Sequence, residues 1–218
     1  MPKITSVEPQ KKNPKRFNVF LDGEFAFGAD EDLVVNRRLV VGKIIVPKDL
    51  QKILFEAEIG KLMERMYRWF ALRQHSEREV RDYFKIKNQK SKIKNGEQVS
   101  NLAIDSTIET LKKKGLLNDL EFAKAWVEAR RKNRQKGIRA IKAELFQKGI
   151  DKEIIEEAVR VQVTGYSEEE LARQALKKKM KYWKNLDMKK LYQKSIEFLL
   201  RKGFDYETVR SVIAENQK

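Results

Sequence analysis

The chain of 218 residues contains no cysteine. This absence excludes disulfide bonds, thiolate catalysis and cysteine-ligated zinc sites. Histidine occurs only once, as His75, so there is no second histidine to share a metal or to form a catalytic dyad. No phosphate-cradling glycine loop is present, because Gly23, Gly28 and Gly42 all fall where hairpin geometry explains them. We therefore expect no catalytic site, no cofactor and no enzymatic activity, and we interpret His75 as a solvated loop residue.

Long apolar runs are absent as well. No segment approaches the length that spans a membrane, and the start Met1-Pro-Lys-Ile4 does not resemble a signal peptide. The simplest expectation is a soluble, monomeric, cytoplasmic protein without membrane contact.

Positive charge is abundant. Lysine and arginine number 48 against 32 aspartates and glutamates, and the resulting charge of +16 strains a compact protein unless an anionic partner offsets it. Residues 1–55 hold only ten of the cations against seven acids, so most of the excess lies in the rest of the chain. The charge favours nucleic acid or an acidic protein surface as the partner, although a lysine-rich proteome would give the same composition.

The first 46 residues predict a small α/β module. Two strand-like segments, 16–21 and 24–28, flank Asp22-Gly23, a dipeptide that favours the type I′ turn of a tight hairpin. A module of this size is expected to lean on the helix that follows it. A third strand, a short helix and a fourth strand are expected at 4–7, 29–37 and 40–46.

Three later segments share one pattern: leucine, two variable residues, a cation, glycine and an apolar residue. They are Leu111 to Leu116, Leu145 to Ile150 and Leu199 to Phe204. The pattern is typical of a helix end at which the leucine is buried, the glycine is left-handed and the last residue folds back onto the helix. The cation faces the negative end of the helix dipole. Each segment is followed by another helical pattern, which indicates repeated helical units.

From Pro47 onward the apolar residues keep helical spacing, and we expect nine helices in three units of three. The fold class is therefore mainly α: tandem three-helix repeats in an elongated, curved array, preceded by the β-hairpin module. Residues 85–97 are interpreted as a lysine-rich loop. Expected domains are 1–46, 47–117, 118–165 and 166–218. Expected helix starts are marked by capping residues, namely Ser76, Asn118, Asp151, Ser167, Asp187 and Asp205. One tryptophan per unit is interpreted as core packing: Trp69, Trp126 and Trp183.

Three cationic clusters are the candidate binding residues, because lysine and arginine stripes neutralise phosphates. The alternative is that lysine simply solvates the polar helix faces. The preferred contacts surround one helix–helix junction: Arg130, Arg131, Arg134, Lys136, Arg139 and Lys142. The second choice is Lys177, Lys178, Lys181 and Lys184. The third cluster is in the expected loop: Lys85, Lys87, Lys90, Lys92 and Lys94.

The middle of the chain resembles the RecX regulatory family. It reads Gly115-Leu-Leu-Asn-Asp-Leu-Glu-Phe-Ala-Lys-Ala-Trp-Val-Glu-Ala-Arg130, then Lys136-Gly137, Glu144-Leu145 and Lys148-Gly149-Ile150. Leu72-Arg73 with Ser76 and Glu79 is similar to the opening motif of the family, and Leu199 to Tyr206 is similar to the closing one. The likeness runs from about Ala57 to the C-terminus. Three departures stand out: Asn118 in place of an acidic residue, a longer 85–97 loop, and Asn88 where a glycine cap is expected.

This resemblance implies a cytoplasmic protein that binds the filament of the RecA recombinase and restrains its ATPase and strand exchange in homologous recombination and DNA repair. On that basis the chain is expected to be a non-enzymatic regulator whose basic surface meets the filament and its single- or double-stranded DNA. The alternative is a stand-alone helical DNA-binding protein, although no base-reading stripe of Asn, Gln or Arg is evident. A structural scaffold without an anionic partner is a third possibility.

Overall fold

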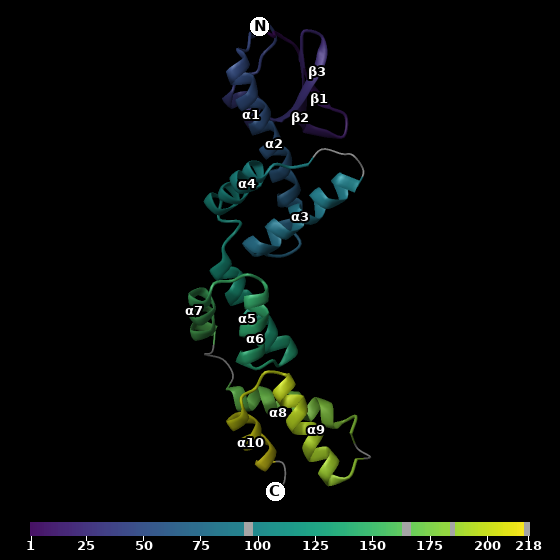
Figure 1. Ribbon diagram of the computed structural model, residues 1–218, viewed down its shortest axis with the longest axis vertical. Helices are drawn as coiled ribbons and strands as arrows, with labels where there is room; N and C mark the ends of the chain where they lie inside the picture. Colours follow the sequence, from purple (N-terminus) through teal and green to yellow (C-terminus); the bar gives the residue numbers. More distant parts are fainter. Residues whose placement is uncertain (94–97, 163–166, 184–185, 216–218) are drawn as a thin grey trace. The chain divides into compact units, whose positions relative to one another are not determined.

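The computed structural model describes residues 1–93, 98–162, 167–183 and 186–215 (Figure 1). Three strands and ten helices lie within these residues, so the prediction of a mainly α protein with a small strand-containing N-terminal module is confirmed. Contacts divide the chain into two compact units. The first joins Met1–Gln74 with Arg81–Leu117, and the second joins His75–Val80 with Asn118–Lys218.

The N-terminal sheet is antiparallel, with the strand order β1-β2-β3. Its strands are β1 (Ile4–Gln10), β2 (Asn13–Leu21) and β3 (Glu24–Asp30). Asp22 and Gly23, between β2 and β3, have φ angles of 49° and 92°. Two successive positive φ angles are what a type I′ turn requires, so the predicted tight hairpin is confirmed.

The fourth strand expected at 40–46 does not form. This segment makes one isolated bridge, between Ile44 and Lys3, and a few backbone bonds to the start of β1, such as Ile4 N–H to Lys43 C=O at 2.8 Å. Gly42 has a φ of 92°, which is incompatible with extended backbone and interrupts any ladder.

The core of the module lies between the sheet and two helices, α1 (Glu31–Asn36) and α2 (Pro47–Phe70). Asp30 caps α1 by accepting a bond from Leu33 N–H at 2.8 Å. The buried residues come from all of these elements: Ile4, Val19, Phe27, Ala29, Leu33, Leu39, Ile45, Ile53 and Ala57. Because Ile53 and Ala57 belong to α2, the expectation that the module leans on the following helix is confirmed.

The second half of α2 packs with α3 (Glu77–Ile93) and α4 (Asn101–Lys113). The prediction of a loop from residue 85 is wrong as far as 93, and residues 94–97 lie outside the described part. Lysine and glutamine are good helix formers even without an apolar period. Asn88 is therefore a helical residue and not a cap, and its carboxamide bonds both Val99 N–H and Val99 C=O, at 2.9 and 2.8 Å.

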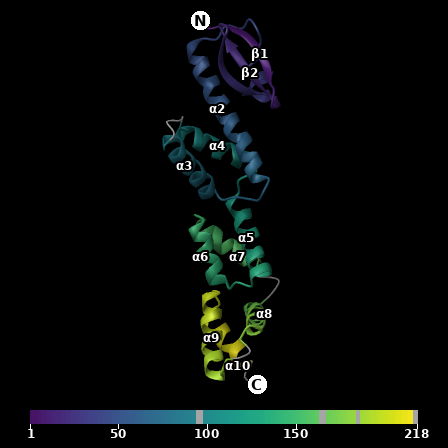
Figure 2. The ribbon, with the colours of Figure 1, turned by 90° about the vertical axis from the view of Figure 1, so that its right-hand side faces the viewer.

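Two groups of three helices build the second unit (Figure 2). Repeat 2 contains α5 (Asp119–Arg134), α6 (Ile138–Gln147) and α7 (Lys152–Gln162), and repeat 3 contains α8 (Glu168–Met180), α9 (Met188–Arg201) and α10 (Tyr206–Glu215). Asn118, Ser167 and Asp187 cap their helices with side-chain oxygens, as predicted. Each repeat has its own hydrophobic core, around Phe122 and Leu145 in repeat 2 and around Leu199 and Phe204 in repeat 3.

The three leucine–glycine segments end helices as predicted. They close α4, α6 and α9, and their glycines have φ angles of 69°, 76° and 89°. In the third, Phe204 N–H bonds Leu199 C=O at 3.3 Å and Gly203 N–H bonds Leu200 C=O at 2.9 Å. This pair of bonds defines the Schellman motif, and the other two segments repeat it. The motif thus closes the third helix of one group but the middle helix of repeats 2 and 3.

His75 is not a solvated residue. It is only 2% exposed, and its Nδ1 lies 3.1 Å from Glu79 Oε2. The reason is that the connection before α3 packs against the second cap, where Ser76 Oγ donates to Lys148 C=O at 2.9 Å and Lys148 Nζ pairs with Glu79. The lysine of that cap therefore serves a tertiary contact.

The tryptophans pack against aromatic neighbours. Trp69 lies 4.8 Å from Tyr83, Trp126 lies 5.5 Å from Phe122, and Trp183 lies 5.9 Å from Phe198, measured between ring centroids. Trp126 and Trp183 also border the cores of their repeats. The four domain boundaries and the elongated, curved arrangement of the repeats stay predictions.

Candidate functional site

The backbones of repeats 2 and 3 meet directly, at a contact that we call the repeat junction: Gly137–Ala140 against Lys202–Phe204. The N-cap of α6 is Gly137, which offers no side-chain oxygen. Instead, Gly137 N–H donates to Lys202 C=O at 3.0 Å, and Arg139 N–H donates to Gly203 C=O at 3.2 Å. The carbonyl end of α9 thus satisfies the amide end of α6, with favourable alignment of the two helix dipoles.

This approach requires both glycines of the repeat junction. A Cβ on Gly137 would lie 2.5 Å from Phe204 N, and a Cβ on Gly203 would lie 2.8 Å from Ala140 Cα. Both distances are shorter than any van der Waals contact, so neither site has room for a larger residue.

A buried ion pair reinforces the repeat junction. Arg131 Nη1 lies 2.6 Å from Glu168 Oε1, and the two side chains are 5% and 18% exposed. Glu168 also accepts a bond from Ile138 N–H at 3.2 Å. Arg131 was expected on the binding surface, but in the structure its guanidinium is enclosed and serves to hold the two repeats together.

Glu144 on α6 gathers two more of the candidate cations. Its carboxylate accepts from Arg130 Nε at 2.6 Å, from Trp126 Nε1 at 2.8 Å, and from Lys136 Nζ. Arg130 also stacks on Trp126, with its guanidinium carbon 3.9 Å from the ring centroid. Burial alone would raise the pKa of Glu144, but the bonds from Lys136, Arg130 and Trp126 outweigh it and the pKa is lowered. Arg130 and Lys136 are therefore partly neutralised inside repeat 2.

Other cations of the first cluster are accessible. Lys142 pairs with Glu156 at 2.6 Å, and both side chains are substantially exposed, so this pair contributes little and exchanges readily. Arg134 and Arg139 have exposed side chains and form no ion pair within the described part of the chain.

The second cluster lies at the end of α8. Lys177, Lys178 and Lys181 are exposed, and Lys178 Nζ donates to Gln135 Oε1 at 3.0 Å across the two repeats. Lys184 lies outside the described residues. Tyr182, next to this cluster, is 82% exposed, and Lys179 Nζ lies 5.8 Å from its ring centroid. Sequence reasoning overlooked Tyr182.

Lys202 is the second residue that sequence reasoning overlooked. As the lysine of the third cap it was assigned to the dipole of its own helix, but its Nζ donates to Arg134 C=O, at the end of a different helix. Burial lowers the pKa of Lys202, and the charges of Lys136, Lys178 and Arg134 lower it further. The structure thus brings Arg134 and Lys136 of the first cluster and Lys178 of the second cluster close to Lys202.

The third cluster is not a loop. Lys85, Lys87, Lys90 and Lys92 lie along α3, and Lys94 lies outside the described residues. Their charges come from a single helix in the first unit, without convergence from several elements.

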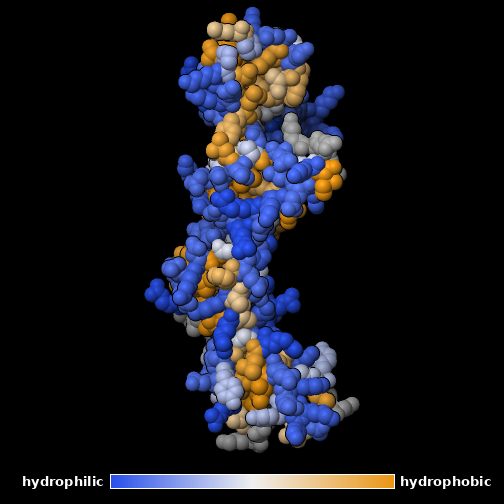
Figure 3. Space-filling view, viewed as in Figure 1, coloured by the Kyte–Doolittle hydropathy of each residue, from blue (hydrophilic) through white to orange (hydrophobic). Residues whose placement is uncertain are grey.

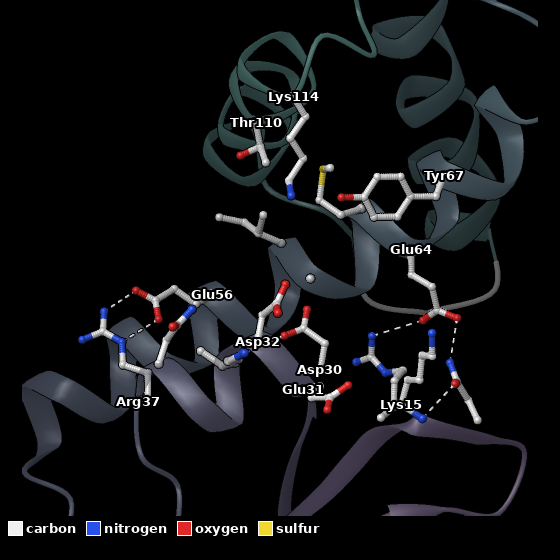
Figure 4. Close-up of a pocket in the computed structure, with 17 residues that line it drawn as sticks. Lys15, Asp30, Glu31, Asp32, Arg37, Glu56, Glu64, Tyr67, Thr110 and Lys114 are labelled. Atoms are coloured by element: carbon white, nitrogen blue, oxygen red, sulfur yellow. Dashed lines mark hydrogen bonds and ion pairs between the residues drawn. The ribbon is translucent and has the colours of Figure 1, made fainter.

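A cavity of about 740 Å³ lies in the first unit, between the sheet, α1, α2 and α4 (Figure 4). Two ion pairs lie among its lining residues: Arg37 binds Glu56, and Arg16 lies 3.2 Å from Glu64. The bond from Arg37 is the main reason why the pKa of Glu56 is lowered, which is the opposite of what a general acid needs. The described residues that line the cavity include no histidine, cysteine or serine.

Within the described ranges, no cluster of three metal-ligating side chains occurs, and none of the helices has the length and apolarity required to cross a bilayer. Most of the face in Figure 3 is hydrophilic, while hydrophobic residues gather over the N-terminal module. Exposed aliphatic residues of that module include Val35, Val40, Val41 and Ile44. Apolar patches of this kind are typical of protein contacts.

Comparison with known proteins places the chain in one class. Three family models match it: the regulatory protein RecX N-terminal domain at residues 2–46, the second three-helix domain of RecX at 118–159, and the third at 167–213. A crystal structure of regulatory protein RecX aligns with a TM-score of 0.72 and 25% identity, covering 97% of this chain and 98% of that one. RecX from Lactobacillus salivarius shares the fold, with a TM-score of 0.59 over 72% of this chain and 96% of that one at 23% identity. The fold is that of a three-helix-repeat regulatory protein.

Full-length relatives identify the family. Regulatory protein RecX of Bacillus subtilis is 35% identical over 98% of this chain and 76% of its own length. The RecX proteins of Listeria monocytogenes and Bacillus velezensis are each 32% identical, over 98% and 100% of this chain and 75% and 78% of their own lengths. The chain belongs to the RecX family of regulatory proteins.

Proposed function

We propose that this protein is a non-enzymatic regulator that binds the RecA recombinase filament and restrains its ATP hydrolysis and strand exchange during homologous recombination and DNA repair. One observation carries the proposal: the chain aligns over nearly its whole length with proteins named regulatory protein RecX. In this role the protein acts in the cytoplasm as a monomer and needs no cofactor.

The basic surface of the second unit supplies the contact. Accessible cations attract both the phosphates of filament DNA and acidic protein surface, and arginine in particular suits bidentate binding. The main contacts are the exposed cations Arg134, Arg139, Lys177, Lys178 and Lys181. Arg130, Lys136 and Lys142 take part only by exchanging an internal carboxylate for the partner, and Lys184 extends the second cluster.

ATP hydrolysis by RecA on single-stranded DNA tests the proposal directly. The protein, added well below the amount of RecA, is expected to lower the hydrolysis rate or shorten the filaments. Reversing the charge of Arg134 and Arg139 to Glu is expected to weaken this effect, whereas reversing Lys189 and Lys194, exposed on α9, is the matched control. Unchanged hydrolysis and unchanged filament stability with the wild-type protein would rule the function out.

The exposed ring of Tyr182 among lysines favours a second candidate, a stand-alone DNA-binding protein. Base–aromatic stacking contributes about 1–3 kcal/mol per base in single-strand binders. This candidate requires tight, salt-dependent binding to naked DNA and no response from RecA. Titration of labelled single and double strands at several salt concentrations, with and without RecA, separates the two functions.

A further inference from the structure

Four cations lie close together beside Gln135, and we call them the junction tetrad: Arg134, Lys136, Lys178 and Lys202. The charges of the first three act on Lys202, whose Nζ donates to Arg134 C=O. Gln135 itself is 6% exposed, and its left-handed backbone, with a φ of 43°, turns the chain between α5 and α6. Its Nε2 donates to Lys132 C=O at 2.8 Å, and its Oε1 accepts from Lys178 at 3.0 Å. Two of the cations come from repeat 2 and two from repeat 3.

The tetrad is under-neutralised. Two carboxylates at this place already accept hydrogen bonds from other groups. Glu144 accepts from Arg130, Lys136 and Trp126, and Glu168 accepts from Arg131 and from Ile138 N–H. Among the described residues, neither Arg134, Lys178 nor Lys202 forms an ion pair. Only Lys136 of the tetrad has an internal counter-ion, Glu144, and the fold therefore holds the other three cations together without one among the described residues.

Repulsion within the tetrad affects the pKa of Lys202. Burial comes first among the causes that lower the pKa of this ammonium, and the three neighbouring cations act in the same direction. Both effects disfavour its charged form. A bound anion would reverse the second effect and offset the first.

We propose that the junction tetrad binds a backbone phosphate of nucleic acid, and that the bound phosphate strengthens the docking of repeats 2 and 3. Phosphate oxygens point in several directions and accept from donors on separate helices, whereas the two oxygens of a carboxylate lie in one plane. Lysine is an established point-charge ligand of phosphate, and arginine adds a bidentate fork.

Phosphate binding is coupled to the docking of the repeats because the four cations come from both repeats. When the repeats are docked, the cations of both repeats face one anion; when they are apart, the anion loses half of its ligands. An anion that binds only the docked state stabilises it by RT ln(1 + [L]/Kd). The inference depends on the proposed function in one respect: the proposed function makes filament DNA the biological source of the phosphate.

Thermal unfolding of the full chain without RecA tests the site, with three probes at one ionic strength: inorganic tripolyphosphate, a short oligothymidylate and polyglutamate. We expect both phosphate probes to raise Tm and polyglutamate to raise it much less. In the double variant Lys178→Gln and Lys202→Gln, the rise with phosphate should disappear. The control Lys189→Gln and Lys194→Gln removes the same charge from an exposed face of α9 and should keep the rise.

The salt dependence of oligothymidylate binding gives a second readout. Each lost phosphate contact reduces the slope of log K against log salt by about 0.7 for a single strand, so loss of the one phosphate held by the tetrad is expected to reduce the slope of the double variant by about 0.7 and that of the control by nothing. Should the variant not fold, amine acylation of the wild-type protein replaces it, because tripolyphosphate should protect Lys178 and Lys202 and leave Lys189 and Lys194 reactive.

Three results would overturn the inference: equal stabilisation by polyglutamate, equal losses in the control, or no protection of the tetrad lysines. Because these assays contain no recombinase, their failure leaves the proposed regulation of RecA standing. Failure of the RecA assay would in turn leave a phosphate site in place.

Discussion

The same helix cap has different surroundings in the two units. In the first unit, a Cβ on Gly115, which closes α4, would meet nothing within 4 Å. In the second unit, Gly203 abuts Ala140, and the carbonyls of Lys202 and Gly203 accept the first amides of α6. One local sequence pattern therefore only ends a helix in one unit, but joins two repeats in the other.

The difference lies in the partner and not in the cap. Gly137 has no side chain, so the backbone of α6 reaches the carbonyls that a Schellman motif leaves at the end of α9. Within the described ranges, no such partner lies next to Gly115. The cap connects two repeats where a helix that begins with a glycine can approach it closely.

The largest expected effect is that of Gly203→Ala. A left-handed alanine costs about 1–2 kcal/mol, and overpacking against Ala140 adds about 1–3 kcal/mol, so the second unit should lose roughly 2–5 kcal/mol of stability. Urea denaturation monitored by circular dichroism measures this loss. If the variant were as stable as wild type, the close backbone approach would be wrong.

Glu168→Gln should have the next largest effect. It removes the negative charge that the enclosed guanidinium of Arg131 contacts at 2.6 Å, although the amide oxygen can still accept from Ile138 N–H. A hydrogen bond to a charged group contributes about 1.5–3 kcal/mol, and a loss of that size is expected in the same denaturation assay. The matched control is Glu169→Gln on the half-buried neighbour, which forms no ion pair within the described part of the chain and should stay within about 0.5 kcal/mol of wild type.

Gly115→Ala sharpens the comparison between the caps. Only the left-handed strain remains there, so a loss of about 1–2 kcal/mol is expected. A loss equal to that of Gly203→Ala would mean that the two caps do not differ in their surroundings.

Glu144 should make the second unit sensitive to acid. Because its pKa in the folded state is lowered, its contribution to stability is present above the unfolded pKa of about 4.3 and is lost as the pH falls through the lower folded value. The stability difference between wild type and Glu144→Gln is expected to be largest near neutral pH and to shrink below about pH 4. Urea midpoints across that range measure it, and a difference independent of pH would contradict the assignment.

The smallest effect is expected from the lysines of α3. Replacing Lys85 and Lys90 with Gln keeps helix propensity and removes exposed charges, so stability should change by less than about 0.5 kcal/mol. Binding to filaments should also weaken less than after the same change at Lys178 and Lys202. A larger loss of filament affinity after the changes in α3 would indicate that the contact surface lies in the first unit.

Sequence reasoning succeeded where local chemistry decides the structure. The hairpin turn at Asp22-Gly23, the capped helix starts at Asn118 and Ser167, and the glycine caps all depend on residues within one turn of each other. It failed at residues 85–93, where the absence of an apolar period hid a helix that is held by Asn88 and Val99. It also failed at residues 40–46, whose β-branched residues form only one bridge.

The site was predicted less completely, because the spacing of residues along the sequence does not show which residues of different repeats lie close together. The sequence marked the cations around Arg134, but it could not reveal that Arg131 is enclosed by Glu168 or that Lys202 reaches the end of α5. Lys202 and Arg134 are 68 residues apart in the chain, so no spacing in the sequence connects them. Exposure of Tyr182 depends on where α8 ends, which composition does not fix.

The central claim is that the exposed cations around the repeat junction, Arg134 and Lys178 among them, make the contact with the filament. Its most direct test compares the affinity for assembled RecA–DNA filaments of wild type, of Arg134→Glu with Lys178→Glu, and of Lys189→Glu with Lys194→Glu. Loss of charged contacts costs about 2–5 kcal/mol, so the junction variant is expected to bind at least tenfold more weakly while the control keeps its affinity. Equal affinities of the two variants, with both folded, would contradict the account.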